Sequence, residues 1–394
     1  MNTFVYKKHR CIQPYFGLIA AILLFAYETR AQLTAPRYDE RLLFRGMTGI
    51  TFGGAQQEWN LSGFGNVLQQ SGPVRLAVPL SNRILITVEN SPAMTKLGTL
   101  TVQGIADTRA SFSYVVPGDK LWINGGVSMP TGITELTHSQ YEIATIVAQP
   151  AFNYYVPVFG QGLNGNVGFA YAYSYTRRFI IGLGASYLYK GEYVPVVIEG
   201  ATEKLNYDPG DEISANAGFD YSTFSRNQRF SADMTVTNYL PDKVNNVKSF
   251  QSGMRYMLFL VYSIKDGATS HMFQLRSRIH SRNQIFSNGA STTFKSSQQV
   301  EATYRFSWLL GNWFSVGIPL EWKQYTGDQI PLGGSIIETG TAGVGSAGVD
   351  AGILFSQSAS LSLTAKYGEG SVTINSTRYT VKGTEIGGGV RIQF

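Results

Sequence analysis

The stretch QVEATYRFSWLLGNWFSVGIPLEWK, residues 299–323, alternates in polarity on both sides of a short turn. One face of its first half is apolar, with Val300, Ala302, Tyr304, Phe306 and Trp308. The opposite face is polar, with Gln299, Glu301, Thr303, Arg305 and Ser307. After LLGN the same alternation returns, with Phe314, Val316, Ile318, Leu320 and Trp322 on one side. A period of two is that of a β-strand, so the stretch predicts a two-faced antiparallel hairpin.

Similar segments of about ten residues recur through most of the chain, separated by turn residues. Their polar faces carry Ser, Thr, Asn and Gly with few charges, whereas a soluble β-sandwich would show more Lys and Glu there. Charged residues are only 15% of the chain, below the roughly 25% of soluble proteins. Aromatic residues gather at strand ends, as in the girdles of membrane barrels. The segments are 166–175, 179–189, 212–221, 229–237 and 361–367.

The pattern predicts an all-β fold, a closed antiparallel transmembrane β-barrel of about 14 strands, within a range of 12–16. We expect the barrel to cover residues 98–394, with the short turns at one end. The longer polar stretches should lie at the other end, outside the cell: 190–211, 239–249, 283–297, 325–342 and 368–381. Residues 32–97 alternate less well. They are either the first strands or a plug folded into the lumen.

Residues 1–31 have the features of a cleaved signal peptide: a basic start, the apolar run YFGLIAAILLFAY, and small residues Thr29 and Ala31 before the expected cut. The only cysteine, Cys11, lies in this leader, so the mature chain would hold no disulfide and no thiolate metal ligand. The net charge of +6 falls to +3 without the leader. No basic block remains, which argues against nucleic-acid binding.

The last residues, GTEIGGGVRIQF (383–394), form a strand pattern that ends in an aromatic. Phe394, Ile392, Val390 and Ile386 lie on one face, and this strand resembles the terminal strand of Gram-negative outer-membrane β-barrels. The resemblance implies an outer-membrane location among outer-membrane lipids, and recognition of Phe394, Ile392 and Val390 by the barrel-assembly machinery.

A second resemblance is to the long-chain fatty-acid and hydrocarbon transporters of the outer membrane. It rests on NSPAM (90–94), GGVSMPTGITEL (125–136) and FGQGLNGNVGFAYAYS (159–174). That family is porin-like, with 14 strands and an N-terminal hatch. The resemblance implies transport of hydrophobic molecules.

One predicted strand carries a row of cations. The residues that share its polar face are Gln274, Arg276, Arg278, His280 and Arg282. Arginine on the lipid face costs about 2–4 kcal/mol at the midplane, so this row should face the lumen. It could attract anions, or it could pair with lumenal carboxylates such as Glu301 on the next strand, and the two roles are compatible. We expect Arg305 to contribute to the same field.

The segment GMRYMLFLVYS (253–263) turns apolar residues to both faces. Met257, Phe259 and Val261 should face inward, where they either pack against a plug or form an apolar patch for a hydrophobic substrate. The chain contains no metal-ligand spacing, nucleophile elbow or P-loop. We therefore expect no enzyme, no cofactor and no metal site.

The sequence as a whole predicts an outer-membrane channel or transporter for passive uptake of a small-molecule solute. The second resemblance implies that this solute is hydrophobic. The alternative is a non-transport envelope barrel, which would act as a structural or partner-binding protein through its external loops.

Overall fold

A computed structural model describes residues 48–394 except residues 64, 134, 138–139, 141–151, 153, 155–161, 196–205, 226, 288, 333–334, 339 and 375–376. The expected leader and residues 32–47 therefore lie outside the described residues. Among the described residues, no helix has both the length and the apolar character needed to cross a membrane.

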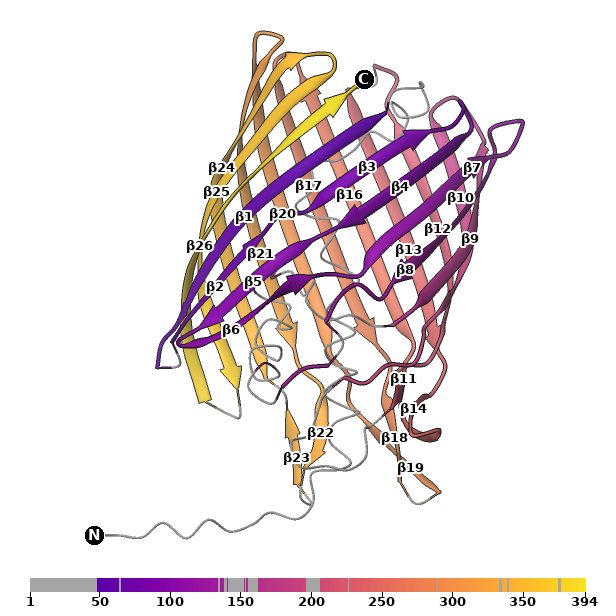
Figure 1. The fold of residues 1–394 in the computed structure, drawn as a ribbon. Coiled ribbons are helices and arrows are strands. Elements are labelled where there is room, and N and C mark those ends of the chain that lie inside the picture. Colours follow the sequence, from indigo (N-terminus) through magenta and orange to yellow (C-terminus); the bar gives the residue numbers. More distant parts are fainter. Residues whose placement is uncertain are drawn as a thin grey trace.

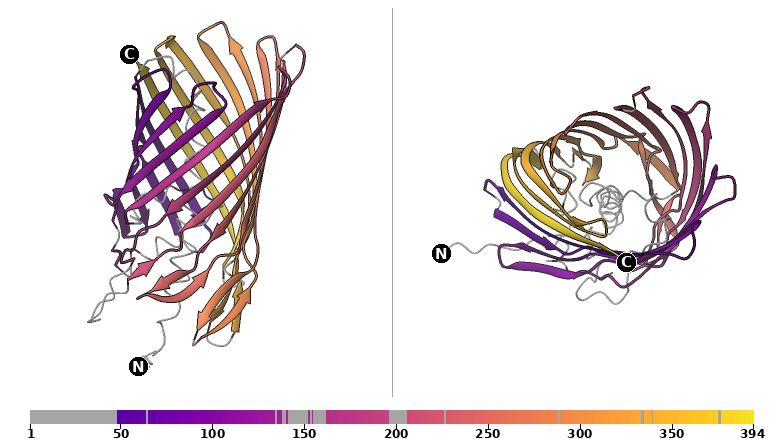
Figure 2. Two further views of the ribbon diagram at one scale, coloured as in Figure 1. Left: turned by 90° about the vertical axis from the view of Figure 1, so that its right-hand side faces the viewer. Right: turned by 90° about the horizontal axis from the view of Figure 1, so that it is seen from above.

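The described strands close into one antiparallel barrel, which Figure 1 shows from the side and Figure 2 also from above. The fold-class prediction is confirmed, but the expected 14 strands were too few, because the wall has 16. Three wall strands are each split into two segments. In ring order the wall is β1 (Gly49–Leu61), β2 (Gly65–Ser71) with β3 (Val74–Pro79), β4 (Ile84–Asn90) with β5 (Pro92–Leu97), β6 (Leu100–Ile105) with β7 (Thr108–Val115), β8 (Leu121–Met129), β9 (Asn164–Ser174), β10 (Phe179–Tyr189), β12 (Glu212–Ser222), β13 (Gln228–Tyr239), β16 (Arg255–Asp266), β17 (Thr269–His280), β20 (Gln298–Leu310), β21 (Phe314–Thr326), β24 (Thr341–Ser356), β25 (Ala359–Ile374) and β26 (Thr377–Gln393).

The last strand closes the ring onto the first. Gly49 of β1 lies opposite Gln393 of β26, and the register continues to Leu61 opposite Val381. Beyond this ladder, Thr48 and Phe394 exchange two backbone hydrogen bonds of 3.0 Å. We call the rim at these two residues the terminal rim, and the opposite one the distal rim.

Residues 49–97 form strands of the wall, and no described residue of that range belongs to a plug. The two missing strands of our count lie here. They were hidden because residues 55–73 do not alternate, and Pro73 lies in the break between β2 and β3. A proline has no N–H for the ladder. The register between neighbouring strands continues past Pro73 and Pro92 and shifts by one residue at Ala106–Asp107. Neighbouring strands compensate, since the Gly53 N–H donates to the Pro73 carbonyl at 2.7 Å and the Gly72 N–H to the Pro92 carbonyl at 2.9 Å.

Segment β6 differs from the other wall segments in its pairing. Among the described residues it pairs only with β5, whereas its continuation β7 pairs with β4 and β8. Val102 of β6 points into the barrel and is buried.

Two small sheets extend past the distal rim, at the end opposite the C-terminus in Figure 1. We call the larger one the distal sheet. It contains β11 (Tyr207–Asp208), β14 (Asp242–Val244), β15 (Val247–Gln251), β18 (Asn283–Ser287) and β19 (Ala290–Phe294). The smaller pairs β22 (Gln329–Leu332) with β23 (Ser335–Glu338).

The distal sheet and β22–β23 are formed by the long connections between wall strands. Four of the five polar stretches therefore lie at the end expected for them: 190–211, 239–249, 283–297 and 325–342. The fifth stretch also lies at the distal rim, but as strand and not as a loop. Residues 368–381 lie mostly within β25 and β26, which are 16 and 17 residues long.

Candidate functional site

The predicted cation row lies on the inward face of β17. Arg276, Arg278 and His280 are each less than a tenth exposed, while the alternate residues Phe273, Leu275 and Ile279 are exposed on the outside. Arg282 does not belong to the row. The strand ends at His280, and Arg282 is exposed in the connection that follows.

Arg276 has the carboxylate partner that the sequence suggested. Its guanidinium lies 3.8 Å from the Glu301 carboxylate on β20, directly opposite in the register, and both side chains are buried. The Gln299 amide also donates to Glu301, at 2.5 Å. The same guanidinium lies over the Phe259 ring, 5.9 Å from its centre, which is a cation–π distance.

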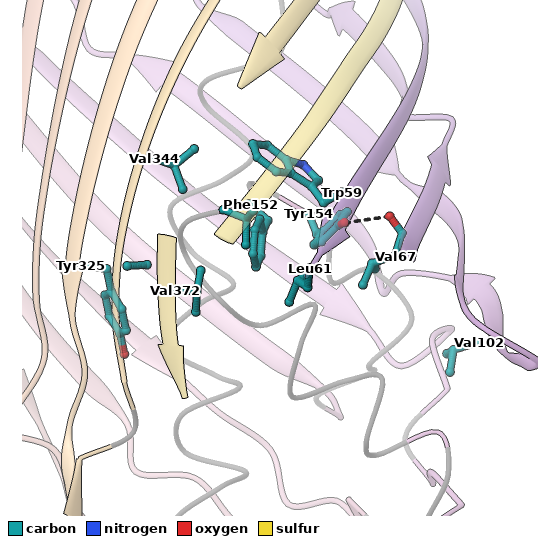
Figure 3. Packing of buried hydrophobic residues seen from close by; sticks show 11 residues of the cluster. Trp59, Leu61, Val67, Val102, Phe152, Tyr154, Tyr325, Val344 and Val372 are labelled. Atoms are coloured by element: carbon teal, nitrogen blue, oxygen red, sulfur yellow. Dashed lines mark hydrogen bonds between the residues drawn. The ribbon is translucent and has the colours of Figure 1, made fainter. Parts of the chain in front are cut away.

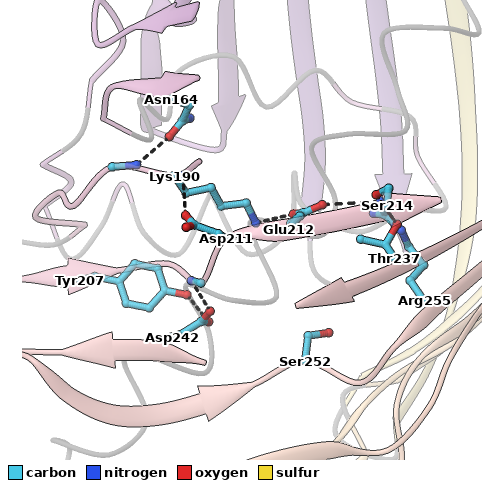
Figure 4. Close-up of polar contacts among 12 residues, drawn as sticks. Asn164, Lys190, Tyr207, Asp211, Glu212, Ser214, Thr237, Asp242, Ser252 and Arg255 are labelled. Carbon is cyan, nitrogen blue, oxygen red and sulfur yellow. Dashed lines mark hydrogen bonds and ion pairs between the residues drawn. The ribbon is translucent and has the colours of Figure 1, made fainter. Parts of the chain in front are cut away.

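Arg255 at the start of β16 extends this cationic face, and sequence reasoning missed it. Its side chain lies 3.7 Å from Glu212, which also binds Lys190 (Figure 4). The Tyr239 ring lies beneath both cations, 5.7 Å from Lys190 and 5.6 Å from Arg255, and stacks on His280. The sequence could have pointed to Arg255, because Arg255, Met257 and Phe259 are alternate residues and therefore share the inward face of one strand.

We call this set the cationic wall: Lys190, Arg255, Arg276, Arg278 and His280, with Glu212 and Glu301 between them. Four permanent cations share two carboxylates, so the set keeps an excess of positive charge. Because these side chains are themselves buried, salt screens their charge less than it would on an open surface.

Arg305 belongs to a different lumenal group. Its guanidinium reaches across β21 to Asp350 on β24, at 3.0 Å, and Asp350 also accepts from Thr364 at 2.7 Å. Nearby, Glu321 binds Lys366 at 2.7 Å and Lys323 at 3.4 Å. This side of the lumen is close to charge balance.

Met257, Phe259 and Val261 face the lumen by parity, opposite Arg278, Arg276 and Gln274 of β17. All three are half-buried. Their neighbours are therefore charged and polar. The structure places the large apolar lumenal surface elsewhere.

That surface, which we call the apolar wall, lies on the inner side of β21, β24–β26, β1, β2 and β6 (Figure 3). Its members are buried apolar side chains: Trp59, Leu61, Val67, Val102, Tyr325, Ala342, Val344, Val372 and Val381. The Trp59 indole lies flat on two glycines. A Cβ on Gly383 would come within 2.4 Å of it and one on Gly368 within 2.8 Å, so this position of the ring requires both glycines.

Two aromatic residues from the β8–β9 connection cover the apolar wall. The Phe152 ring lies 5.1 Å from Trp59 and 5.7 Å from Tyr154. The Tyr154 hydroxyl donates to the Val67 carbonyl at 3.0 Å. Both side chains are at most 1% exposed. Phe152 and Tyr154 thus fill part of the lumen, and they do not come from residues 32–97, for which a plug was one of our two expectations.

The sequence analysis missed the apolar wall because the polarity of the wall strands inverts there, with apolar residues on the inside and polar residues on the outside. Towards the distal rim, Gln57, Trp59 and Leu61 point inward, while Glu58 and Asn60 point outward and are exposed. Strands need about 9–11 residues to cross a bilayer, and β24–β26 have 16 or 17. This end of the wall therefore extends beyond the hydrocarbon layer.

The two walls face each other across the barrel. In the ring order of 16 strands, β1 is first and β16 and β17 are tenth and eleventh, which is close to diametrically opposite. Figure 1 agrees, with β1 in front and β16 and β17 at the back. The lumen thus has one apolar and one cationic side.

Two buried acids hold the distal sheet. Asp242 accepts from the Tyr207 hydroxyl at 2.5 Å and the Gly210 N–H at 2.8 Å. Asp328 accepts from the Ser297 N–H at 2.7 Å and the Asn283 amide at 3.2 Å. Burial raises the pKa of each carboxyl to about 6, although these hydrogen bonds lower it. Each acid ties together connections from different wall strands.

The outer surface decides the class of protein. Side chains such as Phe169, Leu183, Leu275, Ile318 and Val349 are exposed around a closed wall, on the faces opposite the polar lumenal residues. Only lipid matches such a band, and a closed barrel leaves no unpaired edge for it. The barrel is of the outer-membrane type. In that class the short turns lie on the periplasmic side, so we expect the terminal rim to be periplasmic.

Comparisons with known proteins give structural likeness only. No family model matches the chain, and no curated protein matches it. Among solved structures, a bacterial polysaccharide outer membrane secretin aligns with 8% identity over 89% of this chain and 99% of that one, with a TM-score of 0.45. The CymD monoaromatic hydrocarbon channel aligns with 14% identity over 90% and 91%, at 0.43. The outer membrane channel DcaP of Acinetobacter baumannii aligns with 10% identity over 88% and 96%, at 0.42. The resemblance to fatty-acid transporters stays an expectation, and the 16 strands differ from the 14 of that family.

The C-terminal residues lie where their alternation predicts. Phe394, Ile392 and Val390 are exposed on the outside of β26, whereas Gln393 and Glu385 are buried on the inside. Their recognition by the assembly machinery stays a prediction. In the part of the chain that the structure describes, no group of three or more His, Cys, Asp or Glu is placed to hold a metal ion.

Proposed function

We propose that the barrel is a channel for passive uptake of small amphipathic anions, molecules with an apolar body and one negative charge. The observation that carries the proposal is the pairing of the two lumenal walls. Trp59 and Val344 of the apolar wall, which Phe152 and Tyr154 cover in this structure, would contact the body of such a solute once uncovered, and the charge of Arg276 and Arg278 would attract its anionic group. No catalytic step is assigned to the chain.

Each wall supplies a separable part of the selectivity. Apolar surface removed from water stabilises a bound solute by roughly 25 cal/mol per Å². Rings or rows of arginine favour anions over cations in pores. A solute that lacks either the apolar body or the charge would use one wall only, so the two contributions can be measured independently.

Octanoate and acetate separate the two contributions, because they share a carboxylate and differ in the apolar tail. The purified barrel is placed in planar bilayers, and reversal potentials are recorded in gradients of the two potassium salts. We expect Arg276→Gln with Arg278→Gln to lower the anion-to-cation permeability ratio for both salts about tenfold, which corresponds to ~1.4 kcal/mol. We expect Trp59→Ala to reduce the preference for octanoate over acetate and to leave the anion preference unchanged.

Arg229→Gln is the matched control, because Arg229 is a half-exposed lumenal arginine paired with Asp220 on another part of the wall. It should change neither ratio by more than about twofold. If the arginine pair behaves like this control, the cationic wall does not select the solute. If no variant and no wild-type barrel conducts either salt, the channel proposal is wrong.

A second candidate function is partner binding at the distal rim. It is favoured by the distal sheet, in which connections from several wall strands form one ordered β-sheet outside the barrel. Deletion of 190–211 or 325–342, followed by affinity capture from envelope extracts, tests it. Loss of a captured protein together with unchanged permeability would favour this role over the channel.

A further inference from the structure

A groove of ≈ 450 Å³ crosses the lipid-facing surface over β13, β16, β17, β20 and β21. Its floor is at Ala302, whose register partners on the two sides are Leu275 and Trp322. A methyl group between two large side chains leaves a depression in the apolar surface. The size is in the range of about 300–1,000 Å³ typical of small-molecule sites.

Stacked aromatic rings form the side of the groove nearer the terminal rim. The Phe273 ring lies 4.7 Å from Tyr304 and 6.4 Å from Tyr262. Such contacts between neighbouring strands hold large rings in fixed positions. The groove is therefore a preformed surface, and a ligand would not have to order it.

Polar groups lie at this end of the groove, on the lipid side. His271 is two residues from the start of β17, close to the terminal rim. Its Nδ1 lies 2.9 Å from the Tyr304 hydroxyl, and its ring packs on Phe306 at 5.3 Å. In the tautomer whose Nδ1 accepts a hydrogen bond from the Tyr304 hydroxyl, Nε2 carries the ring proton and can donate to another group. The Tyr262 hydroxyl lies beside it and bonds to Gln228 at 3.3 Å.

We propose that this groove binds one phospholipid of the periplasmic leaflet, with an acyl chain over Ala302 and the phosphate at His271 and Tyr304. The order of chemistry along the groove matches such a lipid, because it is apolar at mid-wall and carries donors at the periplasmic interface. A histidine is costly in hydrocarbon, and tyrosine is enriched at the headgroup level. A second copy of the chain would instead need an apolar surface without this polar end.

Native mass spectrometry of the detergent-purified barrel, titrated with palmitoyl-oleoyl phosphatidylethanolamine, tests the proposal. We expect one lipid per barrel at low excess. Ala302→Trp should raise the lipid concentration for half occupancy about tenfold or more, because the indole fills the floor. The control is Ala217→Trp, since Ala217 is an exposed alanine facing outward on β12 beyond the groove. It should bind lipid like the wild type.

Palmitoyl-oleoyl glycerol, which lacks the phosphate, tests the headgroup end. His271→Phe should weaken binding of the phospholipid and leave binding of the diacylglycerol unchanged. Heat-modifiable migration in gels shows that every variant is folded. Equal lipid binding by Ala302→Trp and Ala217→Trp would overturn the proposal. So would a wild-type barrel that carries no lipid and forms an oligomer that Ala302→Trp dissociates, because the groove would then be an interface between copies.

Discussion

Truncating Phe152 should uncover the apolar wall. The ring is 1% exposed and packs against Trp59 and Tyr154. Replacing a buried phenylalanine by alanine costs about 3–5 kcal/mol. Phe152 lies in a connection and not in the hydrogen-bonded ladder of the barrel. The substitution should therefore destabilise the covered state of the apolar wall and not the barrel itself. Because each 1.4 kcal/mol is a factor of ten, Phe152→Ala should raise the uncovered fraction by roughly 10² to 4 × 10³.

Thiol labelling measures this fraction directly. The only cysteine of the sequence is Cys11, in the predicted leader, so a cysteine introduced at the buried Val344 of the apolar wall would be the single reporter. When opening and closing are fast relative to reaction, the labelling rate by a polar thiosulfonate follows the equilibrium population of the open form. Phe152→Ala should speed labelling by the factor given above. Tyr154→Phe, which removes one hydrogen bond worth about 0.5–1.5 kcal/mol, should give a smaller increase.

Phe224→Ala is the matched control, because Phe224 is 82% exposed in a turn at the terminal rim. Exposed truncations stay within about 0.5 kcal/mol, or about a factor of two in rate. If Phe152→Ala leaves labelling at the rate of this control while the barrel migrates as folded, the aromatic contact does not cover the wall.

The remaining predictions concern packing, pH and assembly. Gly383→Ala should displace the indole that lies on this glycine and destabilise the barrel by about 1–3 kcal/mol in urea, whereas Gly54→Ala, with nothing within 4 Å of the added methyl, should not. Burial raises the pKa of Asp328 from 3.8 to about 6, so its docked connections bind more protons than released ones. Their stability should fall as pH rises from about 4 to 6 and then level off. Hydrogen exchange of β18 and β19, corrected for intrinsic rates, should show this loss of protection. Asp328→Asn should reduce the pH dependence, and only the double substitution with Asp242→Asn should remove it, because burial also raises the pKa of Asp242 to about 6. Deleting Phe394 should reduce the amount of heat-modifiable barrel in cells, whereas Gln393→Ala should not.

Where one face of a strand met lipid and the other a polar lumen, the sequence predicted the structure well. Residues 299–323 form the hairpin β20–β21 in continuous register, because both faces of each strand have contrasting solvents along most of their length. The same contrast placed Arg276 inward and made Glu301 its neighbour. A pattern of period two carries this information residue by residue.

The prediction failed where that contrast is weak or reversed. Pro73 and Pro92 interrupt wall strands whose halves are only six or seven residues long, too short for alternation to be recognised. Near the distal rim the polar side faces outward, so QQEWNL (56–61) reads as irregular. The contact of Phe152 with Trp59 joins residues 93 positions apart in the chain and follows no periodicity, so no local pattern could predict it.

The reversed section of the wall also explains why an internal segment covers it. Outside this section the neighbouring solvent is water, which accounts for exposed Glu58 and Asn60. Inside, Trp59 and its neighbours need an apolar partner, since an exposed patch of that kind in an aqueous lumen would be unstable. Phe152 and Tyr154 supply this partner in the present state. An apolar solute that buries a similar area could replace them with little net change in free energy, whereas water could not. Uncovering of the wall would then depend on the presence of the solute, because a ligand shifts a conformational equilibrium only by its differential affinity for the two states.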